Sequence, residues 1–270
     1  MVLPSAHFLF PQVSRAVAPD WAKCCSARPR PRARRQGEDL LATTDLIFSL
    51  GPNCRNAWNL RHQFKVDRAY PFDWWITPAK SMLSLLDRDR SFGVSREDLV
   101  ISVPGPTGNT VYNRRLNLLH HHDFARVNNI VEVVTDAEIE QINAKYTALF
   151  ARFWEDLDRA EHPVAVLNGI ARGWPSGYLP GEADPALNGH IEPQALVDAL
   201  RARLGAKLRV VIIDLGEESH QRLDGGDVVR LPDLGTRDEL PEYLNWVEPV
   251  HVFREAYQRL GFAPALPPVS

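Results

Sequence analysis

The chain has few cysteines and no long apolar run. Only three of its 270 residues are cysteine, and Cys24 is adjacent to Cys25, so the sequence offers no disulfide framework and is typical of a reducing compartment. No stretch approaches about 18 uninterrupted apolar residues, and Pro4, His7 and Pro11 interrupt the first apolar patch. We therefore expect neither a membrane-spanning helix nor a secretion signal, and we predict a cytoplasmic protein without membrane partners.

The common sequence patterns that bind metals and nucleotides are also missing. The chain contains no CxxC pair, no HExxH helix, no GxGxxG turn, no P-loop and no internal repeat. We therefore predict no cofactor and no metal. The three consecutive histidines at 120–122 leave a metal site open as an alternative, although they cannot all face one site on a helix or a strand.

The charge is distributed unevenly along the chain. The formal net charge is −3, but residues 1–37 carry seven Lys or Arg and one acidic residue, which leaves 24 basic and 33 acidic residues in the remainder. Alternating Pro and Arg at 29–35 can neither form a helix nor fill a sheet, so we expect residues 1–44 to be a disordered basic tail. A transit peptide or a nucleic-acid-binding arm stays open for this tail; the rest of the chain suggests no nucleic-acid partner.

Apolar runs alternate with helix-like periodicities from residue 45 to 262, which predicts a single α/β domain followed by a C-terminal tail at 263–270. We expect three layers, with a mainly parallel sheet flanked by helices. Residues 216–226 are predicted to form a loop or short turn. Residues 171–193 are predicted to form a lid, a binding loop or a disordered insertion, with candidate contacts Trp174, Tyr178 and His190. The predicted strands are 46–50, 99–103, 163–167, 208–215 and 227–231, and the predicted helices are 54–64, 78–86, 135–159, 196–204, 238–246 and 250–260.

The third cysteine, Cys54, stands at a predicted strand-to-helix turn. The turn residues 51–53 precede it, and Asn53 occupies the N-cap position. A thiol on the first turn of a helix faces backbone N–H groups and the positive end of the helix dipole, which favour the thiolate. Asn168 and Asp214 likewise follow predicted parallel strands, at the edge of the sheet where sites gather. Cys54 is thus a candidate nucleophile, with a small buried hydrophobic residue as the alternative.

Two later segments supply partners for a nucleophile. Asp73 lies in the aromatic segment 68–77, where a buried carboxylate needs hydrogen-bond donors or a cation. His122 could take the proton of a thiol, with a carboxylate fixing its tautomer. Asp73, Asp123 and Asp214 all stay open as that carboxylate, because side chains of adjacent residues such as His122 and Asp123 rarely pair.

These segments carry a family resemblance. The motifs SLGPNCRNAWNLR, YPFDW and HDF resemble a bacterial family described both as papain-like cysteine peptidases and as a domain of unknown function, over roughly residues 46–260. The resemblance implies Cys54 as nucleophile, His122 as base, and Asp73 or Asp123 as the orienting acid. The oxyanion-binding Gln of papain-type sites is absent, and Asn53 with helix-start N–H groups takes its place. Because a strand precedes Cys54, a mainly parallel sheet is favoured over the papain arrangement of a helix on a separate barrel.

Two functions are compatible with these residues. The first is a cysteine-nucleophile hydrolase or acyl transferase acting on an unidentified peptide, amide, ester or thioester, with Asn53, Arg61 and Trp74 in the oxyanion and substrate site. The alternative is a binding or modifying module for a polar or anionic ligand such as a sugar or nucleotide, in which Cys54 is structural. The arginines that could hold such an anion are Arg61, Arg114 and Arg115. The oligomeric state is not indicated.

Overall fold

The computed structural model describes residues 44–88, 92–102, 108–169, 191–232 and 250–262. Contacts divide the chain into residues 1–35 and 36–270, and all described residues belong to the second unit. The predicted tails up to residue 43 and from 263, the helix at 238–246, and the loop residues Trp174, Tyr178 and His190 lie outside the described residues.

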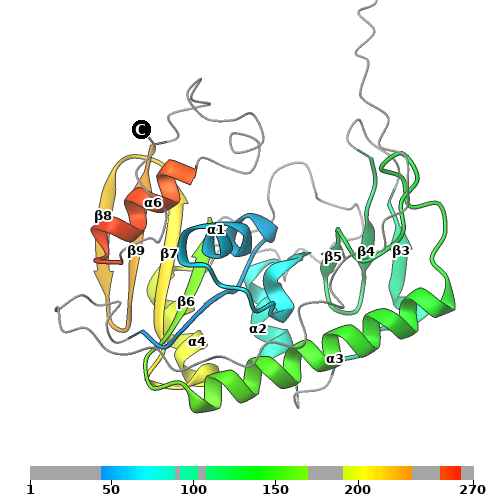
Figure 1. Ribbon diagram of the computed structural model, residues 1–270, viewed down its shortest axis with the longest axis horizontal. Coiled ribbons are helices and arrows are strands. Elements are labelled where there is room, and N and C mark those ends of the chain that lie inside the picture. The colour runs from blue at the N-terminus through cyan, green and yellow to red at the C-terminus, as the bar shows by residue number, and fades with distance from the viewer. Residues whose placement is uncertain (1–43, 89–91, 103–107, 170–190, 233–249, 263–270) are drawn as a thin grey trace, which may run out of the picture. The chain divides into compact units, whose positions relative to one another are not determined.

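The central element is a five-stranded, mostly parallel sheet (Figure 1), which confirms the predicted α/β class. Its strand order is β1-β6-β7-β9-β8, and β8 alone pairs antiparallel with its neighbour. The bounds are Leu46–Ser49 for β1, Pro163–Asn168 for β6, Arg209–Leu215 for β7, Ser219–Leu223 for β8 and Gly226–Leu231 for β9.

Strand β8 corrects the sequence prediction, which made residues 216–226 a loop or a short turn. The strand lies at the edge of the sheet and most of its residues are exposed. A strand without a buried face has no apolar alternation, so its sequence, SHQRL, resembles a polar linker. By reversing the chain direction, β8 allows β9 to return parallel to β7 without a crossover helix.

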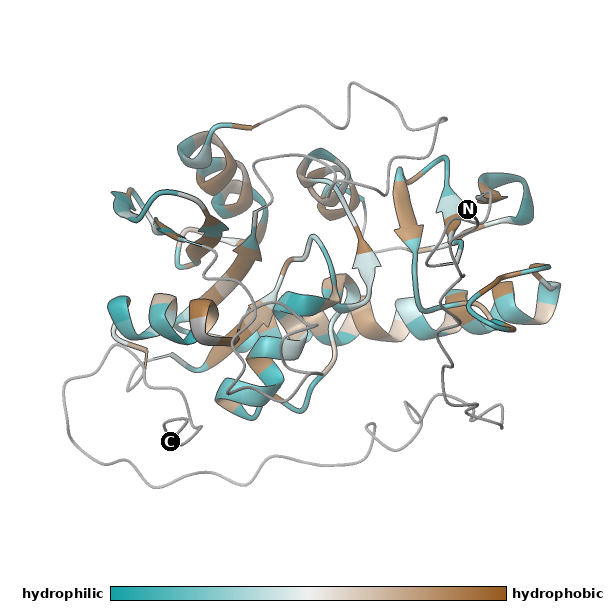
Figure 2. Ribbon diagram, turned by 90° about the horizontal axis from the view of Figure 1, so that it is seen from above, coloured by the Kyte–Doolittle hydropathy of each residue, from teal (hydrophilic) through white to brown (hydrophobic). Residues whose placement is uncertain are grey.

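Helices cover both faces of this sheet, as the three-layer prediction requires. Alternate strand residues point to opposite faces, so Val166 and Val211 pack with α1 and α6, whereas Ala165 and Val210 share a core with the other helices. Coloured by hydropathy, the strands are mostly brown between helices with teal outer faces (Figure 2). The helices are α1, Cys54–Phe64; α2, Ala79–Leu86; α3, Asp136–Arg159; α4, Pro193–Leu204; and α6, Val250–Arg259.

A second sheet, which the sequence did not separate from the first, is antiparallel with the order β2-β5-β4-β3. Its strands are two or three residues long, too short for an alternation of apolar residues to be visible. Helix α3 runs beneath both sheets (Figure 1), and the stacked rings of Trp75 and Tyr146, 4.1 Å apart, join it to β2. The bounds are Trp75–Ile76 for β2, Leu99–Ile101 for β3, Val111–Asn113 for β4 and Leu118–His120 for β5; short 3-10 turns occupy Pro71–Asp73 and Arg96–Asp98.

Helix α3 begins where the sequence predicts. Thr135 is its N-cap, and the Thr135 hydroxyl and the Glu138 carboxylate complete the expected capping box.

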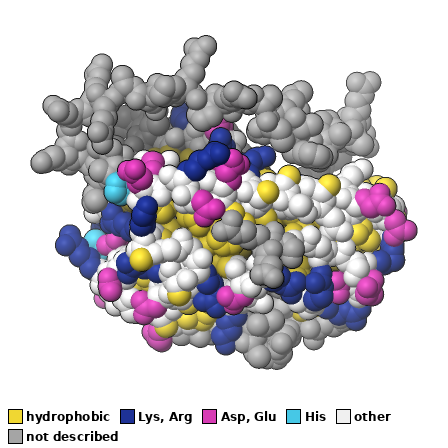
Figure 3. Space-filling model, turned by 90° about the horizontal axis from the view of Figure 1, so that it is seen from below, with side chains coloured by type: hydrophobic (Ala, Val, Ile, Leu, Met, Phe, Trp, Pro, Cys, Tyr) yellow, Lys and Arg dark blue, Asp and Glu magenta, His cyan; other side chains and the backbone are white. Residues whose placement is uncertain are grey.

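On the face drawn in Figure 3, Lys and Arg side chains are interspersed with Asp and Glu around apolar side chains. None of the helices in the described ranges is long and apolar enough to span a membrane.

Phe153 of α3 tests the role of this helix in the core. Its ring is fully buried, 5.2 Å from Phe48 and 6.0 Å from Tyr70 between centroids. We expect Phe153→Ala to lower the free energy of unfolding by about 3–5 kcal/mol, because the cavity removes buried apolar contacts. Urea unfolding with an unchanged m-value measures this loss. The matched change Thr147→Ala, on the exposed side of α3, should alter the free energy of unfolding by no more than about 0.5 kcal/mol. Equal losses of stability in the two variants would contradict the role of Phe153 in the core.

Candidate active site

Three backbone hydrogen bonds to other segments fix the turn between β1 and α1. Leu50 N donates to Val166 O at 3.0 Å, Asn168 N donates to Gly51 O at 3.3 Å, and Thr77 N donates to Pro52 O at 2.9 Å. Gly51 has φ +85°, a left-handed conformation that residues with a Cβ rarely adopt. The turn is thus attached both to the central sheet and to the segment that follows the YPFDW motif.

Asn56 is a residue that the sequence analysis missed. Its side chain is fully buried, and its Nδ2 donates to the carbonyl oxygens of Val166 and Gly51. The first turn of α1 is therefore held against β6. A signal was present in the sequence, because Asn56, Asn59 and Gln63 recur at the spacing of one helix face. All three lie on the buried side of α1, where polar side chains are unusual.

Cys54 is the first residue of α1 and is half-buried, so it is not a core residue. Asn53 is its N-cap, and Asn53 Oδ1 accepts a hydrogen bond from Arg55 N at 3.1 Å. That bond engages the oxygen of the amide and leaves its NH₂ group as a donor beside the helix start. The turn, the cap and the helix dipole together favour a thiolate at Cys54.

Four other predicted site residues form one continuous series of contacts. Arg61 lies two helical turns after Cys54, on the same side of α1. Its guanidinium donates to Asp73 Oδ2 at 2.6 Å and lies 4.9 Å from the centroid of the Trp74 ring. The Trp74 ring meets the His122 ring edge-on, with 5.8 Å between centroids. The structure therefore brings Arg61, Asp73, Trp74 and His122 together.

Asp73 is buried, as predicted, and it has the cationic partner that the sequence analysis required. Burial raises the pKa of Asp73, and the Arg61 charge and the Tyr70 N–H, which donates at 3.0 Å, only partly offset that effect. Asp73 therefore fixes Arg61 and closes the Pro71–Asp73 turn.

His122 is exposed to solvent on part of its surface, but its ring also contacts the rings of Trp74 and His121. Partial burial lowers the pKa of His122 below 6.5, and the positive charges of Arg126 and Lys145 act in the same direction, against Asp123. The imidazole is therefore neutral at pH 7 and can accept a proton. Burial, with His122 and Arg126 nearby, lowers the pKa of His121 to about 4.

Asp123 holds a different histidine from the one expected. Its carboxylate is completely buried; Oδ2 pairs with His120 Nδ1 at 2.8 Å and Oδ1 with Lys145 Nζ at 2.6 Å, and Tyr146 and Trp75 also donate to it. Burial alone would raise the pKa of Asp123, but the hydrogen bond and charge of His120, followed by Lys145, hold it well below its usual value. Asp123 was one of three aspartates left open as the partner of His122; in the structure its carboxylate pairs with His120.

The remaining candidates divide between the site and the periphery. Asn168 is the last residue of β6 and Asp214 lies near the end of β7, so both lie at the carboxyl edge of the central sheet, as predicted, and both are largely buried. Arg114 and Arg115 bind elsewhere, at Glu97 O and the Asp98 carboxylate. Among the described residues, no three His, Cys, Asp or Glu side chains come together as a potential metal site.

Comparison of the chain with protein-family models, with curated proteins and with solved structures gave no match. The candidate site therefore depends on its own geometry and chemistry.

Asp123 generates a prediction about acid stability. Because its pKa is depressed in the folded state, it stabilises the fold above its unfolded-state pKa of 3.8, and this stabilisation is lost as the pH falls below that value. We expect Asp123→Asn to flatten the pH dependence of the unfolding free energy between about pH 5 and 3, measured by urea unfolding. Asp224→Asn is the control, since the Asp224 side chain is 90% exposed; a wild-type slope in Asp123→Asn would contradict the role of Asp123.

Proposed function

We propose that this protein is a cysteine-nucleophile hydrolase or acyl transferase that acts on an amide, ester or thioester carbonyl. One observation carries the proposal: a half-buried thiol occupies the first residue of α1, at the carboxyl edge of the parallel sheet, on a turn fixed to β6. Thiols with a lowered pKa are found in such surroundings. The resemblance to papain-like cysteine peptidases supports a peptide or amide as the substrate.

Each step of acyl transfer can be assigned to a candidate residue. The thiolate attacks the carbonyl carbon, and His122, neutral at pH 7, takes the thiol proton and delivers it to the departing amine or alcohol. Water or another acceptor then attacks the thioester and releases Cys54. The Asn53 NH₂ group and the backbone N–H groups at the start of α1 stabilise the oxyanion.

Asp73 has an indirect role in this proposal. Its carboxylate accepts from Arg61, whose guanidinium lies over the Trp74 ring, and Trp74 contacts His122. Asp73 thus positions the ring against which His122 rests. Asp123 is fully occupied by other donors and contributes to His122 through its charge, which raises the pKa of that imidazole against the effect of burial.

A second candidate function has its own supporting observation. Arg61 Nη1 is buried and has no hydrogen-bond partner among the described residues. A guanidinium with an unused donor beside a Trp ring could hold a carboxylate, phosphate or sugar hydroxyl group. In this alternative the site binds or modifies a polar or anionic ligand without covalent catalysis. A reduced thiol is not needed for it, whereas the hydrolase requires one and is consistent with the expected cytoplasmic location.

Alkylation kinetics separate the two functions. We expect the rate at which iodoacetamide modifies Cys54 in the folded wild-type protein to rise with pH, with a midpoint below about 8.5, the pKa of a free thiol. Mass spectrometry of the peptide that contains Cys54 measures this rate. His122→Ala should slow this reaction at pH 7 by about tenfold, equivalent to roughly one pKa unit, because the Cys54 thiol loses the imidazole that accepts its proton.

His121→Ala is the matched control for that experiment. Its imidazole neighbours His122 but has a pKa of about 4, so it should leave the alkylation rate unchanged. Should His122→Ala and wild type react equally, with a midpoint near that of a free thiol, the nucleophile proposal fails and the binding module is favoured.

A further inference from the structure

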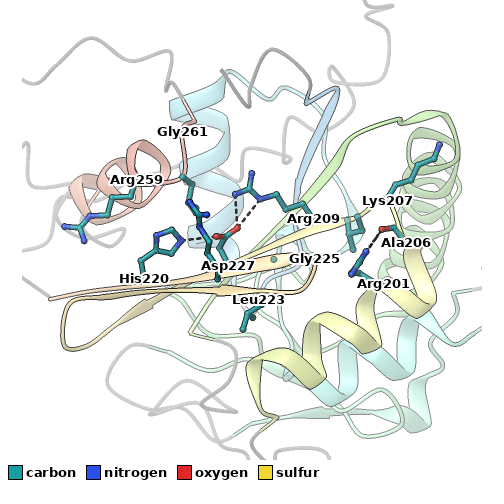
Figure 4. A pocket seen from close by; sticks show the side chains of 14 residues that line it. Arg201, Ala206, Lys207, Arg209, His220, Leu223, Gly225, Asp227, Arg259 and Gly261 are labelled. Carbon is teal, nitrogen blue, oxygen red and sulfur yellow. Dashed lines mark hydrogen bonds and ion pairs between the residues drawn. The ribbon is translucent and has the colours of Figure 1, made fainter. Parts of the chain in front are cut away.

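A hollow lies at the opposite end of the central sheet from Cys54. Its volume is about 700 Å³, and it is lined by the amino end of β7, by β8 and β9, and by the carboxyl ends of α4 and α6 (Figure 4). Strand β7 connects the two edges of the sheet, and its seven residues span about 20 Å at roughly 3.3 Å per residue. The hollow and the candidate active site are therefore separate.

Positive charge dominates the lining of this hollow. In Figure 4, Arg259 and His220 lie toward one end, Arg201 and Lys207 toward the other, and Arg209 lies between them. Arg222 of β8 is a further lining residue, and Asp227 is the one acidic residue of the lining.

Asp227 is already neutralised by its neighbours. It is buried, its Oδ2 accepts from Arg209 at 2.8 and 3.1 Å, and its Oδ1 pairs with His220 Nε2 at 2.9 Å. Arg259 pairs with Glu218 at 2.8 Å and also with Glu255. The Arg201 partner, Asp224, is 3.4 Å away and 90% exposed, so that ion pair is weak.

Two cations in the lining, Lys207 and Arg222, have no acidic partner among the residues that the structure describes. Both side chains are exposed. A cation without an internal partner is available to an anion from solution. Since the only acidic lining residue is saturated, the hollow has an excess of positive charge.

Two of the residues that line the hollow, Gly225 and Gly226, have no side chain. A Cβ added to Gly225 would lie 2.4 Å from Arg201 Nη1, and one added to Gly226 would lie 2.5 Å from Val210 O. Gly225 also has φ +80°. The absence of a side chain at Gly225 lets Arg201 lie against the β8–β9 turn, and its absence at Gly226 lets the start of β9 approach β7 closely.

We propose that this hollow is a second binding site, which takes a small molecule with two or more phosphate groups. Its volume lies within the range of about 300–1,000 Å³ that is usual for small-molecule sites. Guanidinium groups bind phosphate bidentately, and cations at both ends suit a ligand with separated charges. No Phe, Tyr or Trp is among the lining residues, so a nucleobase would find no aromatic ring to stack on. A sugar bisphosphate or a short polyphosphate fits this lining best.

Calorimetric titration of the full chain with inorganic tripolyphosphate, at physiological ionic strength, tests the proposal. Wild type should bind with saturation at one site, and the double variant Arg222→Gln, Lys207→Gln should bind at least about tenfold more weakly, because two phosphate contacts are lost. The control Arg96→Gln removes a partly exposed positive charge next to β3 of the second sheet, away from the hollow, and should bind as wild type does.

Cys54→Ala separates this proposal from the proposed function. It should retain full tripolyphosphate binding, since Cys54 lies at the other edge of the sheet. Undiminished binding in the double variant would place the anion elsewhere, for example on the Arg-rich residues 28–35, and would overturn the proposal. The absence of heat from wild type above dilution would overturn it as well.

Discussion

The attachment of the β1–α1 turn to β6 is the constraint on which the candidate site depends. Val166 O receives Leu50 N and the Asn56 amide, and Gly51 O receives Asn168 N and the same amide. Buried hydrogen bonds of this kind are costly to break, because a partner left unsatisfied pays its full desolvation cost. They fix where α1 begins, and so they fix the position of Cys54 and the direction of the backbone N–H groups beside it.

Two buried aspartates show how the same side chain serves different purposes. Asp73 has one cationic partner, and burial raises its pKa; its effect is to position Arg61 and Trp74. Asp123 has donors from His120, Lys145, Tyr146 and Trp75, and its pKa is held low. Asp123 therefore anchors α3 to the second sheet, whereas Asp73 connects α1 to the ring that contacts His122.

Much of the fold could be predicted from the sequence, because buried strands and an amphipathic helix leave clear periodic patterns. The strand at 208–215 and the helix begun by Thr135 are examples. Strand β8 could not be predicted, since a solvated edge strand has no apolar face, and the second sheet was concealed by the shortness of its strands. The candidate site, too, could be predicted only in part. Position at or just after the end of a strand predicts that Cys54, Asn168 and Asp214 lie at one edge of the sheet, as they do. The pairing of Asp123 with His120 depends on how β5 turns toward α3 and has no signature in the sequence.

The central claim is that the fixed turn and helix start make Cys54 an acidic thiol. Thiolates absorb in the ultraviolet and thiols do not, so a pH titration of the absorbance of wild type minus that of Cys54→Ala isolates this residue from Cys24 and Cys25. The account predicts a midpoint for Cys54 clearly below about 8.5, the value for an unperturbed cysteine. A midpoint at or above that value would contradict it.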